Sequence, residues 1–212
     1  MSEKSTRERL LDTAEQLFAT KGIANTSTRD ITGQAGVNLA SVNYHFGSKE
    51  ALVEEIIARR IVPVNEERLR MLRAYEKENG GQATTEQILR AFIAPGLEML
   101  KHGEVTRSFF LIMGQIHASP ELEKRVIFMK LFADLFVAFQ SAIAKALPHL
   151  DADTVTLRFT FVVGCMVHAL FLQTQMATLP QFPLKNVKMP PQVDLDELSE
   201  ELVEFTKRGM EG

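Results

Sequence analysis

Residues 27–49 read STRDITGQAGVNLASVNYHFGSK, and this stretch decides the fold. Residues 27–30 are typical of a helix start, because the serine hydroxyl can accept a hydrogen bond from the amide three residues on while the acidic side chain reaches back. Gly36 ends this first helix. Asn38 is expected to cap a second helix from Leu39 to Phe46, which Gly47 ends. The stretch therefore predicts two short helices joined by a tight turn.

Two short helices with this connection are typical of the helix-turn-helix, whose second helix enters the DNA major groove. At about 100° per residue, Val42 and Phe46 fall on one side of the second helix and are expected to pack inward. The opposite side then offers side chains to DNA. We expect Ala40, Ser41 and Asn43 to reach base edges, while Tyr44, His45 and Lys49 contact phosphates.

The flanking sequence supplies the helices that such a motif needs. Residues 5–8 repeat the helix-start pattern and are followed by an apolar stripe from Leu10 to Phe18, which Gly22 ends. Ser48 is expected to cap a long helix that runs toward Tyr75, with Pro63 kinking or dividing it.

The remaining chain is also predicted to be helical. Helices are expected at about 85–101, 104–118, 121–147, 152–176 and 195–208, and residues 177–194, which contain four prolines, are expected to be an extended surface linker. No strand pattern is present. We predict an all-α fold of about nine helices: a three-helix helix-turn-helix domain at residues 1–57, with the motif at about 27–46, and a larger helical domain for ligand binding and dimerisation at residues 58–212.

Charge and composition restrict the function less than the motif does. The 212 residues carry a net charge of −3, and residues 1–50 contain equal numbers of acidic and basic side chains. DNA binding would therefore depend on how charge is distributed over the faces of the molecule. A single cysteine, Cys165, and a polar N-terminus without an apolar secretory stretch indicate a cytoplasmic protein.

No pattern typical of an enzyme, a metal site or a cofactor site occurs. The five histidines are scattered. His117 and His168 are two isolated histidines without clustered carboxylates or thiols, so they are interpreted as interior residues and not as metal ligands. We therefore expect no catalytic residue, no metal and no cofactor.

Residues 159–179 contain no charged side chain, which raises the alternative of a membrane span. Six polar residues interrupt the run, and a helix that is apolar all round is also typical of a soluble core. We interpret it as a helix buried on more than one side, with no membrane. The helix at 121–147 has a similarly broad apolar stripe.

The N-terminal residues resemble the TetR family of repressors. The similarity rests on residues 26–31, on Ala35-Gly36-Val37, and on residues 43–52, which read NYHFGSKEAL; it extends from about Thr6 to Ile57, roughly a quarter of the chain. The resemblance implies an all-helical homodimeric regulator of operator DNA, in which a ligand in the C-terminal domain alters the separation of the two DNA-reading heads. It also implies dimerisation through a four-helix bundle, for which helices 121–147 and 152–177 are the candidates.

Some positions depart from the family pattern, namely Asn38, Leu39, Ala40 and Asn43, and these affect which operator is recognised. The reading head is similar to a subgroup that includes fatty-acid-responsive regulators. The predicted DNA-binding residues are Thr28, Arg29, Asn38, Ala40, Ser41, Asn43, Tyr44, His45 and Lys49.

Apolar density in the middle of the chain suggests a pocket for a small apolar or amphipathic ligand. The candidate lining is Phe92, Leu97, Leu100, Phe109, Phe110, Met113, His117, Phe132, Phe136, Phe159, Met166 and Phe171. Arg107, Arg125 and Arg158 could meet an anionic head group. A plain helical core explains the same residues, so a regulator without a small-molecule inducer stays open, as do the operator and the choice between repression and activation.

Overall fold

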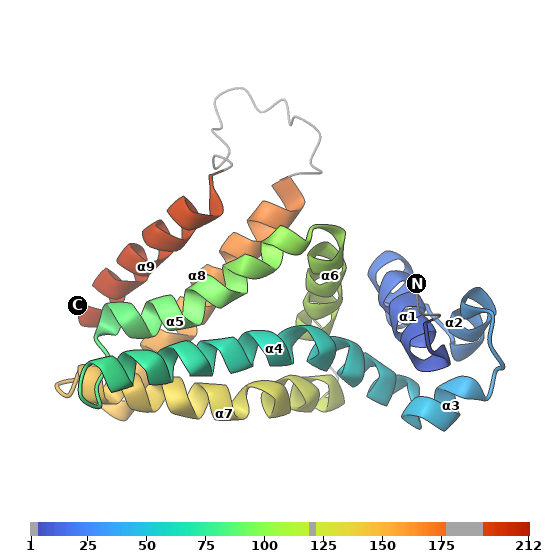
Figure 1. Cartoon of the computed structure of the whole chain (residues 1–212), viewed down its shortest axis with the longest axis horizontal. Helices are drawn as coiled ribbons and strands as arrows, with labels where there is room; N and C mark the ends of the chain where they lie inside the picture. Colours follow the sequence, from blue (N-terminus) through green and yellow to red (C-terminus); the bar gives the residue numbers. More distant parts are fainter. Residues whose placement is uncertain (1–3, 119–121, 177–192) are drawn as a thin grey trace. The chain divides into compact units, whose positions relative to one another are not determined.

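The computed structural model describes residues 4–118, 122–176 and 193–212, and it is all-helical over them, as predicted (Figure 1). The helices run in the order α1 (Thr6–Lys21), α2 (Thr28–Ala35), α3 (Ser41–Phe46), α4 (Lys49–Glu78), α5 (Thr85–Glu98), the 3-10 helix η1 (Met99–His102), α6 (Glu104–Ala118), α7 (Leu122–Ala146), α8 (Ala152–Met176) and α9 (Leu195–Glu211).

These helices form two compact units. The first comprises Met1–Pro63 and Glu104–Leu131, and the second comprises Val64–Gly103 and Phe132–Gly212. This division differs from the predicted boundary between residues 57 and 58, because α6 packs against α1 and so belongs with the N-terminal helices. Helices α4 and α7 each contribute residues to both units.

The first unit has a small core made by α1, α2, α3 and the beginning of α4. Leu10, Phe18, Ile31 and Val42 in this core are completely buried. Both predicted helix starts are confirmed: Ser5 and Glu8 cap α1 reciprocally, and Ser27 and Asp30 cap α2 in the same way. The hydrogen bonds from Ser27 lower the pKa of Asp30, so the cap carries a negative charge at the positive end of the α2 dipole.

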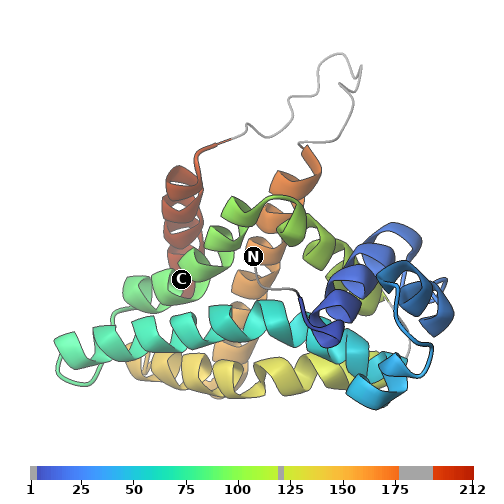
Figure 2. The same ribbon diagram turned by 45° about the vertical axis from the view of Figure 1, so that its right-hand side comes forward.

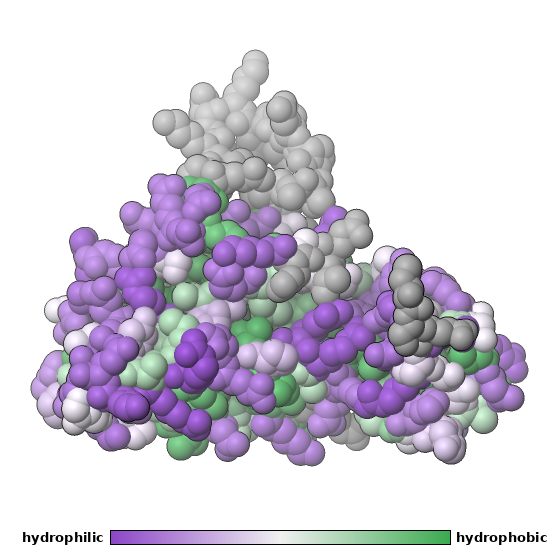
Figure 3. All heavy atoms as spheres, in the orientation of Figure 1, coloured by the Kyte–Doolittle hydropathy of each residue, from purple (hydrophilic) through white to green (hydrophobic). Residues whose placement is uncertain are grey.

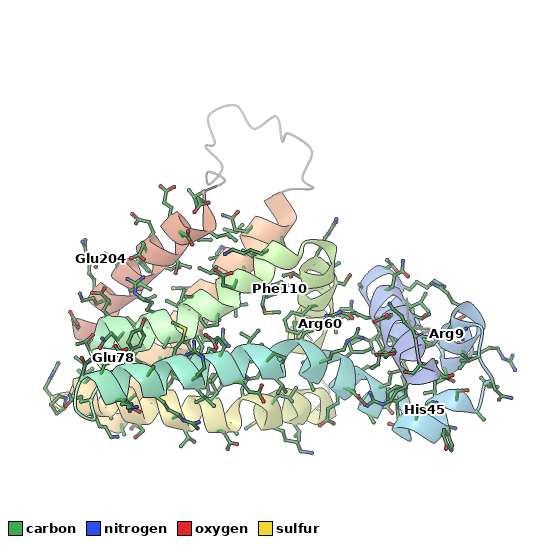
Figure 4. The ribbon with its side chains drawn as sticks, viewed as in Figure 1. Arg9, His45, Arg60, Glu78, Phe110 and Glu204 are labelled. Carbon is green, nitrogen blue, oxygen red and sulfur yellow. The ribbon has the colours of Figure 1, made fainter. Side chains whose placement is uncertain are left out.

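The beginning of α4 is held to α1 by charged groups. The Glu15 carboxylate is buried, and it accepts hydrogen bonds from Arg60 Nε at 3.0 Å and Arg60 Nη2 at 2.8 Å, and also from Arg59 (Figure 4). Arg59 also donates to Asp12 at 2.7 Å. Burial raises the pKa of Asp12, but hydrogen bonds from Lys4 and Arg59 outweigh it and hold that pKa below its usual value.

The start of α3 differs from the prediction. The helix begins at Ser41 and not at Leu39, and its N-cap residue, Ala40, makes no side-chain hydrogen bond. Asn38 does accept a hydrogen bond through its side chain, from the Ala40 amide at 2.9 Å. Because this bond spans two residues, it forms a local turn that delays the helix.

Three further boundaries differ from expectation. Helix α4 is assigned as one helix through Pro63, so the proline does not divide it. The α-helix predicted to reach about residue 101 ends at Glu98 and continues as η1. Helix α9 extends to Glu211, beyond the expected end near residue 208. Most of the predicted linker, residues 177–192, lies outside the described residues.

The second unit is organised around α5, which packs against α8 and α9. Helices α5 and α9 lie side by side in both ribbon views (Figure 2). Arg90 on α5 pairs with Glu200 on α9, and Lys207 on α9 donates to Glu86 on α5 at 3.0 Å. Hydrophilic side chains cover the outer side of α9 (Figure 3), whereas its apolar residues Val203 and Met210 are buried.

Phenylalanine rings from three helices fill the centre of the second unit. The Phe92 ring lies 5.2 Å from that of Phe139 on α7 and 4.9 Å from that of Phe159 on α8. Phe136 adds a further edge-to-face contact with Phe159 at 5.9 Å. Such contacts stabilise a core beyond their buried area.

One face of α8 has no partner among the described residues. Its exposed apolar side chains recur at helical spacing, and they are Leu157, Phe161, Val167 and Phe171. Residues 152–174 are long and apolar enough to cross a membrane by length and composition, the one helix of the described part of the chain with that property. The opposite side of the same helix is buried in the core.

Candidate functional site

Helix α3 presents one side to the core and the other to solvent. Val42 is completely buried, whereas Tyr44 is 84% exposed. The rings of Tyr44 and His45 lie 5.0 Å apart in an edge-to-face contact, and His45 lies at the outer edge of the helix (Figure 4). Val42 therefore holds α3 against the core, and the side chains predicted to face DNA lie around it.

The other predicted DNA-binding residues lie at or near the surface. Those that are exposed are Arg29, Asn38, Ala40 and Asn43, and those that are half-buried are Thr28, Ser41, His45 and Lys49. Phe46 was expected to pack fully inward, but it is half-buried, with the Arg7 guanidinium 5.4 Å from its ring centroid. Because α3 has only six residues, its last turn reaches the edge of the small core.

Lys49 is less available than the sequence indicates. Its ammonium lies 5.9 Å from the ring centroid of Phe18, a cation–π arrangement. It stands at the first residue of α4, where Ser48 Oγ accepts a hydrogen bond from the Ala51 amide at 3.1 Å. A lysine in this place adds positive charge to a helix N-terminus that already favours anions.

The turn between α2 and α3 is fixed by a residue that the sequence did not point to. Arg9 of α1 donates to the carbonyl oxygen of Ala35, and to that of Gly36 at 3.3 Å. Gly36 has φ of 63°, a conformation that favours glycine. A basic side chain on the last carbonyls of α2 satisfies groups that the helix leaves unpaired.

Helix α6 is joined to this reading head by Gln115. Its amide nitrogen donates to the Phe18 carbonyl oxygen at 3.0 Å, and its amide oxygen accepts from the Ile23 backbone at 2.8 Å. These bonds hold the end of α1 and the following turn from a helix about 90 residues away in sequence. The only indication of this role in the sequence is that Gln115 is a polar residue within an apolar helix.

The predicted pocket residues are distributed over both units. Four of them lie on α6 in the first unit, namely Phe109, Phe110, Met113 and His117, and the His117 side chain lies outside the described part of the chain. Among those in the second unit, Phe92, Phe159 and Met166 are buried together near α5, and Phe171 is exposed on the outer face of α8.

A buried arginine in the second unit is the feature that sequence reasoning missed. Arg68 on α4 is 2% exposed. Its guanidinium donates from Nε to the Phe92 carbonyl at 2.8 Å and from Nη1 to Asn65 Oδ1 at 3.1 Å, and Nη2 lies 3.3 Å from Met166 Sδ. Burial lowers the pKa of Arg68 to about 9, so the guanidinium remains charged at neutral pH.

The arginines that were considered for an anionic ligand are placed differently. Arg107 is exposed, and Arg158 donates to the Met210 carbonyl at 2.5 Å. The side chain of Arg125 lies outside the described residues. Across residues 4–118, 122–176 and 193–212, no group of His, Cys, Asp or Glu side chains could hold a metal ion.

Two family models match the chain. Residues 10–56 match "Bacterial regulatory proteins, tetR family", and residues 90–209 match "Tetracyclin repressor-like, C-terminal domain". The second match covers more than half of the chain.

Curated relatives match the N-terminal segment. The repressor KstR2 of Rhodococcus jostii is 47% identical over 51 residues, which are 24% of this chain and 25% of that protein. The probable regulator YttP of Bacillus subtilis is 37% identical over 54 residues, 26% of each chain. The matched segments thus span about a quarter of the length of these relatives.

Solved structures match the fold over nearly the whole chain. A TetR-family regulator from Bordetella parapertussis has a TM-score of 0.65 at 17% identity, covering 96% of this chain and 95% of that one. FadR from Bacillus subtilis, crystallised with stearoyl-CoA, has a TM-score of 0.65 at 16% identity, covering 95% and 98%. Both models and this fold lead to one conclusion: the chain belongs to the TetR family of transcriptional regulators, as its sequence predicted, and not to an enzyme class.

Proposed function

We propose that the chain is a cytoplasmic, homodimeric repressor that binds operator DNA through α3 and leaves it when a small amphipathic ligand binds. The observation that carries the DNA-binding part is the orientation of α3, with Val42 buried and Tyr44 84% exposed. The family membership and the repressors among the relatives of residues 10–56 support the same function.

The predicted DNA-binding residues in and beside α3 divide into two roles. Ser41 and Asn43 carry groups that can hydrogen-bond base edges, and Ala40 is small enough to approach a thymine methyl. Tyr44, His45 and Lys49 suit the phosphate backbone, which sets register without reading sequence. The Arg9 bonds to the α2–α3 turn hold this surface in one geometry.

Homodimerisation would cover the exposed face of α8. Leu157, Phe161 and Phe171 line one side of a helix whose other side is already buried, and α7 exposes Val137 in the same unit. Apolar area of this kind is costly in water and is typical of an interface. Two copies of one helical face form a self-complementary contact, as most dimers do. The same arrangement explains the long apolar α8 without a membrane.

The ligand part of the proposal is supported by a structural relative. A protein of the same fold, FadR from Bacillus subtilis, was crystallised with stearoyl-CoA. A second candidate is a regulator without a small-molecule inducer, and the close contacts among Phe92, Phe139 and Phe159, which fill the core, favour it.

DNA binding can be tested on sequences selected from a random double-stranded pool by the purified protein. Tyr44→Ala is expected to weaken binding to all selected sequences, by roughly 10-fold, with no change in Tm because the side chain is exposed. Tyr75→Ala, a half-buried tyrosine on α4, is the control and should bind DNA as the parent does. A Tyr44→Ala protein that binds as tightly as the parent contradicts the proposed orientation of α3.

The dimer can be tested with two exposed phenylalanines on different helices. Phe161 on α8 and Phe205 on α9 are 60% and 65% exposed. Phe161→Glu places a charge in the proposed interface and should give monomers in sedimentation analysis, whereas Phe205→Glu should remain dimeric. A parent protein that sediments as a monomer rules out the interface.

A further inference from the structure

Arg68 lies in the interior of the second unit, and the described groups that meet its guanidinium there are neutral. Its three hydrogen-bond acceptors are a backbone carbonyl, an amide oxygen and a thioether sulfur, from Phe92, Asn65 and Met166. Its guanidinium carbon is 4.4 Å from the Phe92 ring centroid. No carboxylate pairs with Arg68 among the described residues, and desolvation is the cause of its lowered pKa.

A buried charge without a counter-ion is unusual, because taking a cation out of water costs several kcal/mol that neutral acceptors only partly offset. Arginine has five N–H donors, and the described contacts use three of them. One of these three goes to sulfur, which is a weak acceptor. The guanidinium is therefore short of hydrogen-bond acceptors as well as of negative charge.

We propose that Arg68 is the binding residue for the carboxylate of a small amphipathic acid, which is the ligand of the repressor. This rests on the proposed ligand-responsive function and names the class of the ligand. The flat guanidinium binds a carboxylate through two parallel hydrogen bonds, the strongest neutralising contact available to arginine.

Met166 marks where the carboxylate would enter. Its sulfur occupies the Nη2 side of the guanidinium at 3.3 Å. Methionine side chains are flexible and adapt to new neighbours. A carboxylate oxygen in the place of the sulfur exchanges a weak neutral acceptor for a charged one, which favours the bound state.

Gly96 on α5 leaves the same side of Arg68 without a covering side chain. A Cβ atom there would lie 2.7 Å from Arg68 Nη2 and 3.1 Å from Met166 Sδ. The first distance is shorter than real Cβ contacts and the second is tight, so any other residue would shift the end of the Arg68 side chain that binds the anion and press on the Met166 sulfur.

The surroundings of Arg68 require the rest of the ligand to be apolar. The nearby rings of Phe92 and Phe159 are buried, as is Leu170 farther along α8. A polar body would lose hydration in this core without compensation. An unbranched aliphatic acid combines the required head and tail in the simplest form.

The test compares three probes with the same chain: dodecanoic acid, dodecan-1-ol and dodecanoyl-CoA, titrated calorimetrically into the full-length protein. The parent is expected to prefer the acid to the alcohol. Arg68→Met should lose roughly 10- to 100-fold in affinity for the acid and little for the alcohol, as expected for loss of charge-assisted hydrogen bonds.

Two further variants make the test specific. Arg70→Met changes the same residue type on the same helix, but Arg70 is exposed and paired with Glu67, so its affinity for the acid should equal that of the parent. Arg68→Lys keeps the charge and should keep a reduced preference for the acid, which separates loss of binding from loss of folding.

The proposal is overturned if the parent binds none of the probes, if it binds acid and alcohol equally, or if Arg68→Met binds the acid as the parent does. Preference for dodecanoyl-CoA also overturns it, because the thioester lacks the carboxylate. Failure of the proposed function is distinguishable, since it appears as a parent protein that selects no DNA from the random double-stranded pool, whatever the probes do.

Discussion

Among the described residues, each unit of the molecule buries one charged side chain deeply, and the two have opposite surroundings. Glu15 in the first unit is 5% exposed and accepts hydrogen bonds from two arginines. Arg68 in the second unit is 2% exposed and meets neutral acceptors only. Both charges lie on helices that are otherwise packed by apolar residues.

This difference in pairing indicates that Glu15 has a structural role, whereas the Arg68 charge serves to bind an anion. The Glu15 cluster is neutralised within the protein, and it joins α1 to the beginning of α4. The Arg68 charge has no carboxylate partner in the described residues, so an anion from outside can lower its free energy. Natural proteins commonly give up stability at binding sites in this manner.

Removing the buried carboxylate should have the largest effect on stability. Glu15→Gln leaves Arg59 and Arg60 without their shared partner and should lower the free energy of unfolding by about 2 kcal/mol. This is below the range for fully buried pairs, because the two arginine side chains are 25% and 28% exposed. Urea denaturation followed by circular dichroism measures the change.

Removing the buried cation should have a much smaller effect. Arg68→Met loses the hydrogen bond to the Phe92 carbonyl, worth about 1 kcal/mol, but also removes an unpaired buried charge. The two contributions oppose each other, and we expect the free energy of unfolding to change by less than about 1 kcal/mol. If Arg68→Met lowered the free energy of unfolding as much as Glu15→Gln does, Arg68 would be a structural residue and the contrast between the two buried charges would disappear.

Two helical glycines provide a sharper comparison of the units. Gly96→Ala should destabilise the protein by about 1 kcal/mol, the low end for overpacking, because its Cβ atom would press on the flexible ends of the Arg68 and Met166 side chains. Gly114→Ala on α6, where no atom lies within 4 Å of the new Cβ, should stabilise it by up to about 1 kcal/mol. Equal Tm values for the two variants would mean that Met166 and Arg68 move aside easily.

The smallest effect on stability is expected when the pH is lowered. Hydrogen bonds from Lys207 and Arg90 lower the pKa of Glu86, and one from Arg90 lowers that of Glu200. The pKa values of these two glutamates are lower in the folded state than in the unfolded state. The ion pairs that hold α9 to α5 are therefore fully formed at neutral pH. It weakens as the pH falls through the range where glutamates protonate. Hydrogen exchange of α9 at several pH values measures this, and unchanged exchange in acid would contradict it.

Much of the reading head could be predicted because its signals are local. The caps at Ser5 and Ser27 and the inward position of Val42 follow from spacing alone, and the structure agrees with all three. The start of α3 was wrong by two residues, because residues 38–41 first form a tight turn in which the Ser41 amide donates to the Asn38 carbonyl at 2.9 Å. The partial exposure of Phe46 depends on how far the small core extends, which no local pattern records.

The buried arginine could have been found from one signal. Ile61, Asn65, Arg68 and Leu72 follow helical spacing on one side of α4, and all four are buried. A polar pair in the middle of such a stripe indicates a core position with a special role. The long α4 sequence is rich in exposed arginines and glutamates, so the pattern was hidden among solvated charges.

By itself the sequence determined the helical class, the helix-turn-helix and the side of α3 that faces solvent, because caps, turns and periodicity act over a few residues. Only the tertiary structure decided that α6 belongs with the reading head, that Arg9 and Gln115 hold it, and that Arg68 lies in the core without a carboxylate. Those facts depend on contacts between residues about 25 to 100 positions apart, and burial of a charge is a property of all its neighbours together.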